Sequence, residues 1–110
     1  MITNKTTKEK ISEKEINANT YCNQAWGLMF RKKQNLVMTF KHPRIISLHN
    51  FFVFYPLEIV VLDENKKVVE VKKRFSPFTL WSSARKGKYL LELTLPDSKG
   101  KCKVGDRLKL

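Results

Sequence analysis

The chain has 110 residues, 42% of them hydrophobic, with four glycines and four prolines. This length suits one domain with one core, and the low glycine and proline content excludes a fibrous or disordered class. The formal net charge of +12 at pH 7 favours an anionic partner, although a lysine-rich solvated surface explains the same composition.

The N-terminal segment is polar. Lys and Glu alternate through residues 1–17 around the isolated Ile11 and Ile16, so this segment should bury little, as in a partly ordered arm or an edge strand. We expect it to precede a single domain formed by residues 18–110. Apolar side chains then recur at the spacing i, i+3, i+4, i+7, which predicts one short helix near residues 20–28. These side chains are Cys22, Ala25, Trp26 and Met29.

The middle of the chain is rich in strand signals. Residues 36–40 predict a strand, and Pro43 predicts a turn at residues 41–44, because proline pushes the residue before it out of the helical region. The densest apolar run covers residues 48–63. Within it, residues 59–62 are apolar at every position, which is typical of a central strand covered on both faces.

The second half continues the strand pattern. Residues 59–72 predict a hairpin, and residues 74–87 have no regular period and predict a long ordered loop. Residues 89–95 alternate, with leucines on one side and Glu92 on the other, so a strand with one buried face is expected. Residues 107–110 predict a last strand. Together these elements define an α+β domain with a mostly antiparallel sheet, either open or barrel-like.

The order of short motifs resembles an uncharacterised family, domain of unknown function 192. The resemblance covers nearly everything after the arm. Its motifs are Gly27-Leu28-Met29-Phe30-Arg31, Leu36 to Phe40, Pro56-Leu57-Glu58, Tyr89 to Leu93 and Val104-Gly105-Asp106. Many members carry Trp-Met-Lys-Asn-Thr where this chain has residues 49–53, and the aromatic version found here is similar to archaeal branches. The resemblance implies a fold, since the family has no agreed reaction, cofactor or partner.

Glu58 is the most unusual polar residue of the apolar run. A carboxylate that opens a buried strand must be paired, hydrogen-bonded or protonated. We expect it to be buried, with Arg31 or Arg85 as its partner. The alternative is a catalytic acid with a perturbed pKa.

Metal and cofactor signals are weak. His42 and His49 have no acidic residues at metal-ligand offsets, and Cys22 and Cys102 form no Cys-x-x-Cys pair, so we expect no metal and no cofactor. His49 is either a buried, hydrogen-bonded imidazole or part of a site. We expect both thiols to be reduced in a cytoplasmic protein, because the sequence shows no apolar signal segment and no membrane-spanning run.

The segment of residues 74–88 interleaves Phe75, Phe78 and Trp81 with basic residues, which suits stacking on bases or sugars. The alternative is that these rings plug the end of the sheet.

We therefore expect a small, non-catalytic, cytoplasmic binding or structural domain without a membrane partner. The candidate ligand-binding residues are Arg31, His49, Glu58, Trp81 and Arg85. One alternative is a nonspecific nucleic-acid-binding protein whose binding is weak and sensitive to salt. A second alternative is an enzyme that uses Glu58 with His49.

Overall fold

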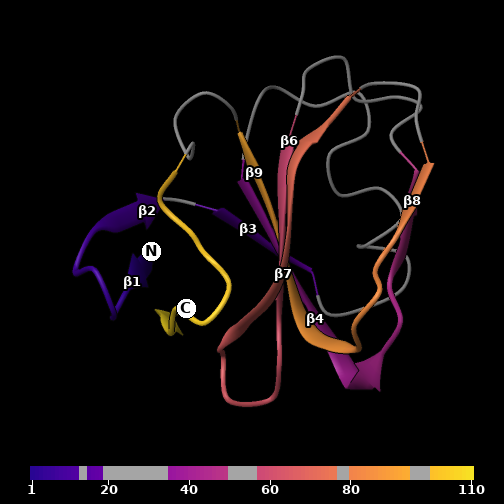
Figure 1. Cartoon of the computed structure of the whole chain (residues 1–110), viewed down its shortest axis with the longest axis horizontal. Coiled ribbons are helices and arrows are strands. Elements are labelled where there is room, and N and C mark those ends of the chain that lie inside the picture. The colour runs from indigo at the N-terminus through magenta and orange to yellow at the C-terminus, as the bar shows by residue number, and fades with distance from the viewer. Residues whose placement is uncertain (13–14, 19–34, 50–56, 77–79, 95–99) are drawn as a thin grey trace.

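Strands build the part of the chain that the computed structural model describes, which is residues 1–12, 15–18, 35–49, 57–76, 80–94 and 100–110 (Figure 1). The strands are β1 (Ile2–Asn4), β2 (Lys10–Ser12), β3 (Glu15–Ala18), β4 (Asn35–Arg44), β5 (Ser47–His49), β6 (Leu57–Leu62), β7 (Val68–Phe75), β8 (Leu80–Ser82), β9 (Gly87–Thr94) and β10 (Leu108–Lys109).

The main sheet has five strands in the order β3-β4-β9-β6-β7. Its neighbours are antiparallel except for β3 and β4, which run parallel. All six residues of β6 are buried, which confirms the prediction of a strand covered on both faces. The middle position, however, belongs to β9, which pairs with β4 on one side and β6 on the other.

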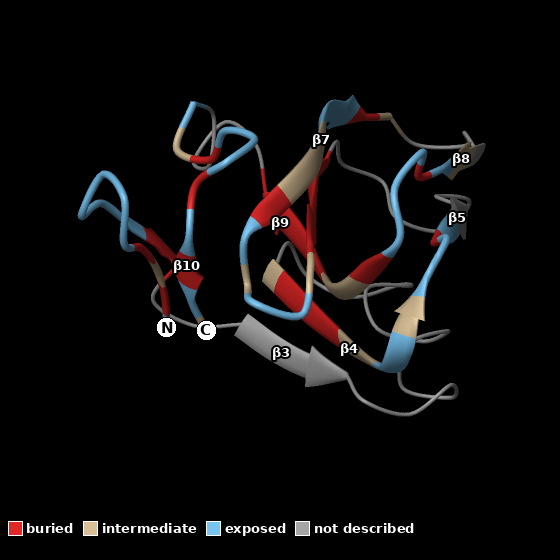
Figure 2. Ribbon diagram, turned by 60° about the horizontal axis from the view of Figure 1, so that its bottom comes forward, coloured by how far each residue is buried: buried red, intermediate tan, exposed pale blue. Residues whose placement is uncertain are grey.

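Two smaller sheets cover the two faces of the main sheet. The sheet β10-β1-β2 lies on one side of it, and the pair β5-β8 lies on the other (Figure 1). We call the covered faces the β1 face and the β5 face. Since neighbouring residues of a strand point to opposite faces, Val60 packs with Ile2 on the β1 face, whereas Ile59 packs with Ile46 on the β5 face. Figure 2 shows the resulting band of buried residues along β4 and β9.

The hairpin of β6 and β7 confirms another prediction. The Asp63 carboxylate closes its turn by accepting hydrogen bonds from the backbone N–H groups of Asn65, at 2.8 Å, and Lys67, at 3.0 Å. Lys66 adopts a φ of 61° in this turn. An aspartate before a left-handed residue is common turn chemistry, which is why the sequence predicted this element well.

The described residues do not show the expected helix, and they decide between an open and a barrel-like sheet. The helix expected near residues 20–28 lies outside the described residues, and the residues that are described contain no helix. Their strands form three separate sheets rather than a closed barrel. No helix in this described part is long and apolar enough to cross a membrane.

The turn and the loop predicted at residues 41–44 and 74–87 are wrong, because the strands extend beyond the apolar residues by which they were recognised. The turn expected at residues 41–44 belongs to β4, whose pairing with β9 shifts register between Thr39 and Arg44, and such an irregularity accommodates Pro43. The loop expected over residues 74–87 contains the end of β7 and all of β8. Strand β8 pairs with β5, which lies far away in the sequence, so no local pattern marks it.

The N-terminal segment packs more closely than its polar sequence suggests. Ile2 and Ile11 are both buried on the β1 face, and β1 pairs with β10 at the other end of the chain. Strand β3 lies at the edge of the main sheet. The expectation that residues 1–17 bury little is therefore wrong for the two isoleucines, while the edge-strand alternative fits β3.

Candidate functional site

Basic side chains gather where β4 ends and β9 begins. Cα pairing places Arg44 beside Gly87, so the exposed Lys86 and Arg85 of the β8–β9 connection lie next to the end of β4. The ammonium group of Lys88 donates a 2.7 Å hydrogen bond to the carbonyl oxygen of Lys41 across the two strands. We call this set the basic corner; it consists of Lys41, Arg44, Arg85, Lys86 and Lys88.

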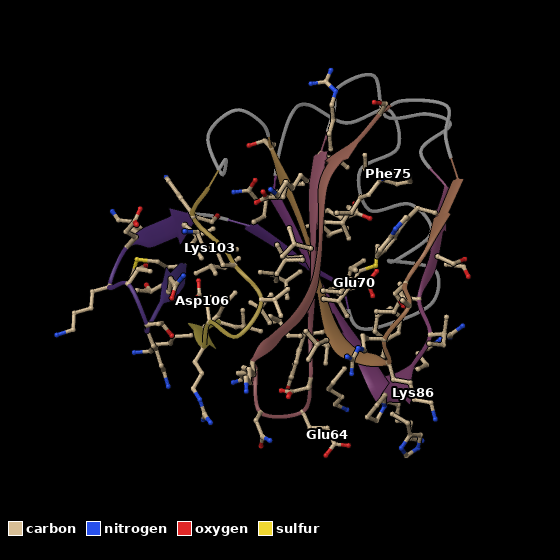
Figure 3. All side chains as sticks on the ribbon, viewed as in Figure 1. Glu64, Glu70, Phe75, Lys86, Lys103 and Asp106 are labelled. Carbon is tan, nitrogen blue, oxygen red and sulfur yellow. The ribbon has the colours of Figure 1, made fainter. Side chains whose placement is uncertain are left out.

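The β8–β9 connection is held in place from both sides. One carboxylate oxygen of Glu70, on β7, accepts hydrogen bonds from the backbone N–H groups of Ala84, at 2.8 Å, and Arg85, at 2.9 Å. The buried Ser83 hydroxyl accepts from the backbone N–H of Ile46 at 2.9 Å and donates to the carbonyl oxygen of Arg85 at 2.8 Å. Figure 3 shows Glu70 on the side of β7 toward β8, and Lys86 at the adjoining corner. The connection therefore presents its basic side chains from an ordered backbone.

Arg44 stacks on an aromatic ring in this corner. Its guanidinium carbon lies 5.6 Å from the centre of the Phe40 ring, within the range of a cation–π contact. Phe40 is half-buried against the β5-face core, whereas Arg44 is exposed. The neighbouring Ile45 is 43% exposed, an unusual value for an isoleucine beside cations.

Two buried glutamates lie on opposite faces of the main sheet. Glu58 pairs across the strands with Leu93, a β1-face residue, and its charge helps to raise the pKa of Cys102. Glu92 lies between Leu36 and Ile59, both of the β5 face. The sheet itself thus separates the two carboxyl groups, and they do not form an acid–base pair.

Glu92 was expected on the open face of a strand with one buried face. It does lie opposite Leu91 and Leu93, but that face is covered as well. It is 7% exposed, and burial raises the pKa of its carboxyl group from 4.5 to about 7. The structure shows no hydrogen bond or ion pair of its side chain with another described residue. The signal in the sequence was the pair Leu90-Leu91, because two consecutive leucines put apolar residues on both faces of the strand.

The predicted site residues that the structure describes do not all lie on one face of the main sheet. Glu58 is buried, as expected, at 3% exposure. The backbone of His49 lies on β5, beyond the β5 face, whereas Glu58 lies on the β1 face, so the main sheet separates them. Arg85 is exposed and its backbone is bound by Glu70. Arg31 lies outside the described residues, and the pairing of Glu58 with it stays a prediction.

The aromatic side chains of residues 74–88 are mostly structural. Phe75 is 2% exposed and belongs to the β5-face core, and Trp81 packs partly buried against the same core. Phe78 lies outside the described residues. For Phe75 and Trp81 a packing role at the end of the sheet therefore fits better than a stacking surface.

The cysteine and metal chemistry is limited. Cys102 is buried, and desolvation, followed by the charges of Glu58, Asp106 and Glu9, raises the pKa of its thiol to about 12. Such a thiol is not a nucleophile at neutral pH. Within the described ranges, no three His, Cys, Asp or Glu side chains are grouped so that they could hold a metal ion.

The layered, mainly antiparallel sheets place the protein in the class of small β-rich domains. Comparison with known sequences then identifies the family: residues 2–110 match DUF192, described as "Uncharacterized ACR", and the chain belongs to this family. The resemblance inferred from the motifs is thereby confirmed. A curated relative is the UPF0127 protein PH1112 of the archaeon Pyrococcus horikoshii, 32% identical over 79 residues, which are 68% of this chain and 67% of the relative.

Two solved structures share the fold. One is a protein named as a "putative transcription regulator" from Sinorhizobium meliloti 1021, with a TM-score of 0.78 and 20% identity, covering 84% of this chain and 78% of that chain. The other is a protein of unknown function from Novosphingobium aromaticivorans, with a TM-score of 0.74 and 22% identity, covering 86% of this chain and 72% of that chain. At these identities the likeness concerns the fold alone.

Proposed function

We propose that this protein is a small, non-catalytic binding domain of the cytoplasm that engages an anionic partner through the basic corner. The observation that carries the proposal is the gathering of five cationic side chains from β4, β9 and the connection before β9. Glu70, the carboxylate beside them, uses one oxygen to hold backbone N–H groups. The corner therefore combines positive charge with an ordered backbone.

The buried ionisable groups support binding over catalysis. Glu58 and Glu92 point to opposite faces of the sheet, and the pKa of the Cys102 thiol is raised to about 12. A general acid or base needs a partner within hydrogen-bond reach of the reacting atom. The exposed basic corner requires no such arrangement.

Binding of this kind should be weak and sensitive to salt. Electrostatic binding to nucleic acid has dissociation constants of roughly 10⁻⁴ to 10⁻⁶ M at physiological salt, and log K falls by about 0.9 per phosphate neutralised on duplex DNA. Because the described part of the chain also has exposed lysines outside the corner, a test must separate binding by the corner from binding by the protein's total charge.

The experiment compares two triple variants with the same loss of charge. The corner variant carries Lys41→Gln, Arg44→Gln and Lys86→Gln. The control variant carries Lys5→Gln, Lys103→Gln and Lys109→Gln, three exposed positions around the β1–β10 sheet. Binding of each to fluorescent heparin is measured by anisotropy over a series of salt concentrations.

We expect the corner variant to bind heparin about tenfold more weakly at low salt, with a shallower salt dependence, and the control variant to lose less than about threefold. Equal losses in both variants would show that only the total charge matters. That result, or the absence of any binding by the wild-type protein, would overturn the proposal.

A further inference from the structure

The basic corner contains one planar cation that differs from its lysines. The Arg44 guanidinium lies over the Phe40 ring, 5.6 Å from its centre, and its Nε lies 3.4 Å from the carbonyl oxygen of Ile45 as a weak donor. Phe40 is anchored in the β5-face core, so the ring supports the guanidinium from below. The exposed guanidinium of Arg44 therefore rests against a ring that the core holds in place.

We propose that the basic corner binds single-stranded nucleic acid, with one base stacked on the Arg44 guanidinium and the neighbouring phosphates held by the lysines. This inference rests on the proposed function and names the partner of the same surface. Base stacking on aromatic rings and on arginine planes is the usual way in which proteins hold unpaired nucleotides.

The arrangement of the surrounding residues favours this partner over others. A duplex hides the faces of its bases, and an acidic protein segment offers carboxylates but few planar rings, so neither uses the Phe40–Arg44 stack. Lys41 lies on β4 and Lys88 on β9, and the Lys88 ammonium donates to the backbone carbonyl of Lys41. Each of the two ammonium groups can contact a phosphate beside the stack. The exposed Ile45 adds apolar contact for the same base or the next.

The Phe40–Arg44 stack does not include the aromatic residues that the sequence analysis named. Phe75 and Trp81 pack against the β5-face core, so they do not offer two free ring faces to a strand. The sequence did not mark Phe40 as a site residue, because it ends an apolar strand pattern that is typical of core residues. Its contact with Arg44 becomes visible only in the folded chain.

The test uses a fluorescent oligothymidylate of about 12 nucleotides and an abasic strand of the same length, which has the same phosphates without bases. A duplex of the same length is the third probe. Anisotropy measures the affinity of the full-length protein for each probe at one low salt concentration. The variants are Arg44→Lys, which keeps the charge but loses the plane, and Phe40→Leu, which removes the ring and keeps an apolar side chain. Arg107→Lys is the matched control, since Arg107 is exposed, lies outside the corner just before β10, and has no aromatic ring beneath it among the described residues.

We expect the wild-type protein to bind the oligothymidylate at least about tenfold more tightly than the abasic strand. Arg44→Lys and Phe40→Leu should lower the affinity for the oligothymidylate to that for the abasic strand, and Arg107→Lys should retain the preference. Because Arg44 is exposed, the Arg44→Lys variant keeps the test valid if Phe40→Leu fails to fold.

The outcomes separate this inference from the proposed function. If all three probes bind equally and the corner variant weakens all of them, the single-strand inference fails and anion binding by the corner stands. If the base preference survives in both Arg44→Lys and Phe40→Leu, the base does not stack on Arg44 and the inference is overturned. If heparin and all three probes fail to bind, both proposals fall together.

Discussion

The side-chain amide of Asn4 donates a 2.8 Å hydrogen bond to the carboxylate of Asp106, 102 positions later in the chain. The same amide also donates to the carbonyl oxygen of Lys101 at 2.9 Å, and its oxygen accepts from the backbone N–H of Thr6 at 2.9 Å. Asp106 additionally accepts from the backbone N–H of Lys103, and Figure 3 shows both residues on the C-terminal segment. Asn4 is fully buried, so this network closes the β1–β10 sheet.

Asn4→Ala should therefore cost about 2 to 3 kcal/mol of unfolding free energy, because it leaves a buried carboxylate without one of its donors. The control is Thr6→Ala, since the Thr6 hydroxyl accepts a bond from the backbone N–H of Arg107 at an exposed position. We expect a cost below about 1 kcal/mol there. Urea unfolding curves measure both values, and similar costs for the two variants would contradict the prediction.

The buried Glu92 should make stability depend on pH. The folded-state pKa is raised from 4.5 to about 7, so the native protein holds this proton more tightly than the unfolded chain does. The stabilisation is fully present below about pH 4.5 and is lost as the pH rises to about 7, which amounts to about 3 kcal/mol. Glu92→Gln removes the titration, so the variant should gain about 2 to 3 kcal/mol relative to the wild type between about pH 5 and pH 8.

Urea unfolding of both proteins at the two pH values measures this difference. The control is Glu64→Gln at an exposed position of the β6–β7 turn, which should change stability by less than about 0.5 kcal/mol. A constant difference between wild type and Glu92→Gln would show that Glu92 does not titrate in this range.

Gly87 lies where β9 begins and has no room for a side chain. A Cβ atom there would collide with Cγ1 of Val61 and lie 2.9 Å from Cδ1 of Ile46. Gly87→Ala should cost about 1 to 3 kcal/mol through overpacking. In the double variant with Val61→Ala the new methyl group fills the vacated space. The destabilisation of the double variant should therefore be smaller than the sum of the two single destabilisations by at least about 1 kcal/mol. Thermal unfolding measures the stability of the three variants, and additive destabilisations would contradict this contact.

Glu70 acts on the basic corner in two opposing ways. It holds the backbone of Ala84 and Arg85, and it reduces the positive charge nearby. Glu70→Gln keeps an acceptor oxygen and removes the charge, so heparin binding should tighten by about threefold. Glu70→Ala also removes the acceptor, so its affinity should be lower than that of Glu70→Gln. Identical affinities would mean that the order of the connection does not matter for binding.

The thiols should be reduced and Cys102 should be unreactive. Burial keeps Cys102 protonated, and only the thiolate is alkylated at an appreciable rate. We expect an intact mass that matches two free thiols at Cys22 and Cys102. Peptide mapping after iodoacetamide treatment at about pH 8 should show no label on Cys102 until the protein is denatured. A label on native Cys102, or a disulfide, would contradict this expectation.

Local patterns were enough to predict the elements whose neighbours are close in sequence. Strand β6 and its hairpin with β7 follow from the apolar run and the Asp63 turn, and both are confirmed. Strand β8 could not be predicted in this way, because its three residues gain their order by pairing with β5. The same reason explains the missed extension of β4 to Arg44, which pairs with Gly87.

The candidate site was predicted only in its gross chemistry. The charge indicated an anionic partner and the burial of Glu58 was confirmed, but Phe75 belongs to the core and Trp81 packs against it. The basic corner depends on the Cα pairing of Arg44 with Gly87, a relation that spacing along the chain does not reveal. The burial of Glu92 was missed because the sequence of a strand does not show whether other elements cover its polar face.

The pairing of β1 with β10 has a consequence for the order in which the protein can form during synthesis. Thr3 pairs with Lys109, so the small sheet cannot close until Lys109 has left the ribosome. Until then Ile2, which is fully buried in the finished fold, stays exposed to water and to other chains. Before that point the nascent protein has an open β1 face, and chaperones that bind short apolar segments can reach Ile2 there.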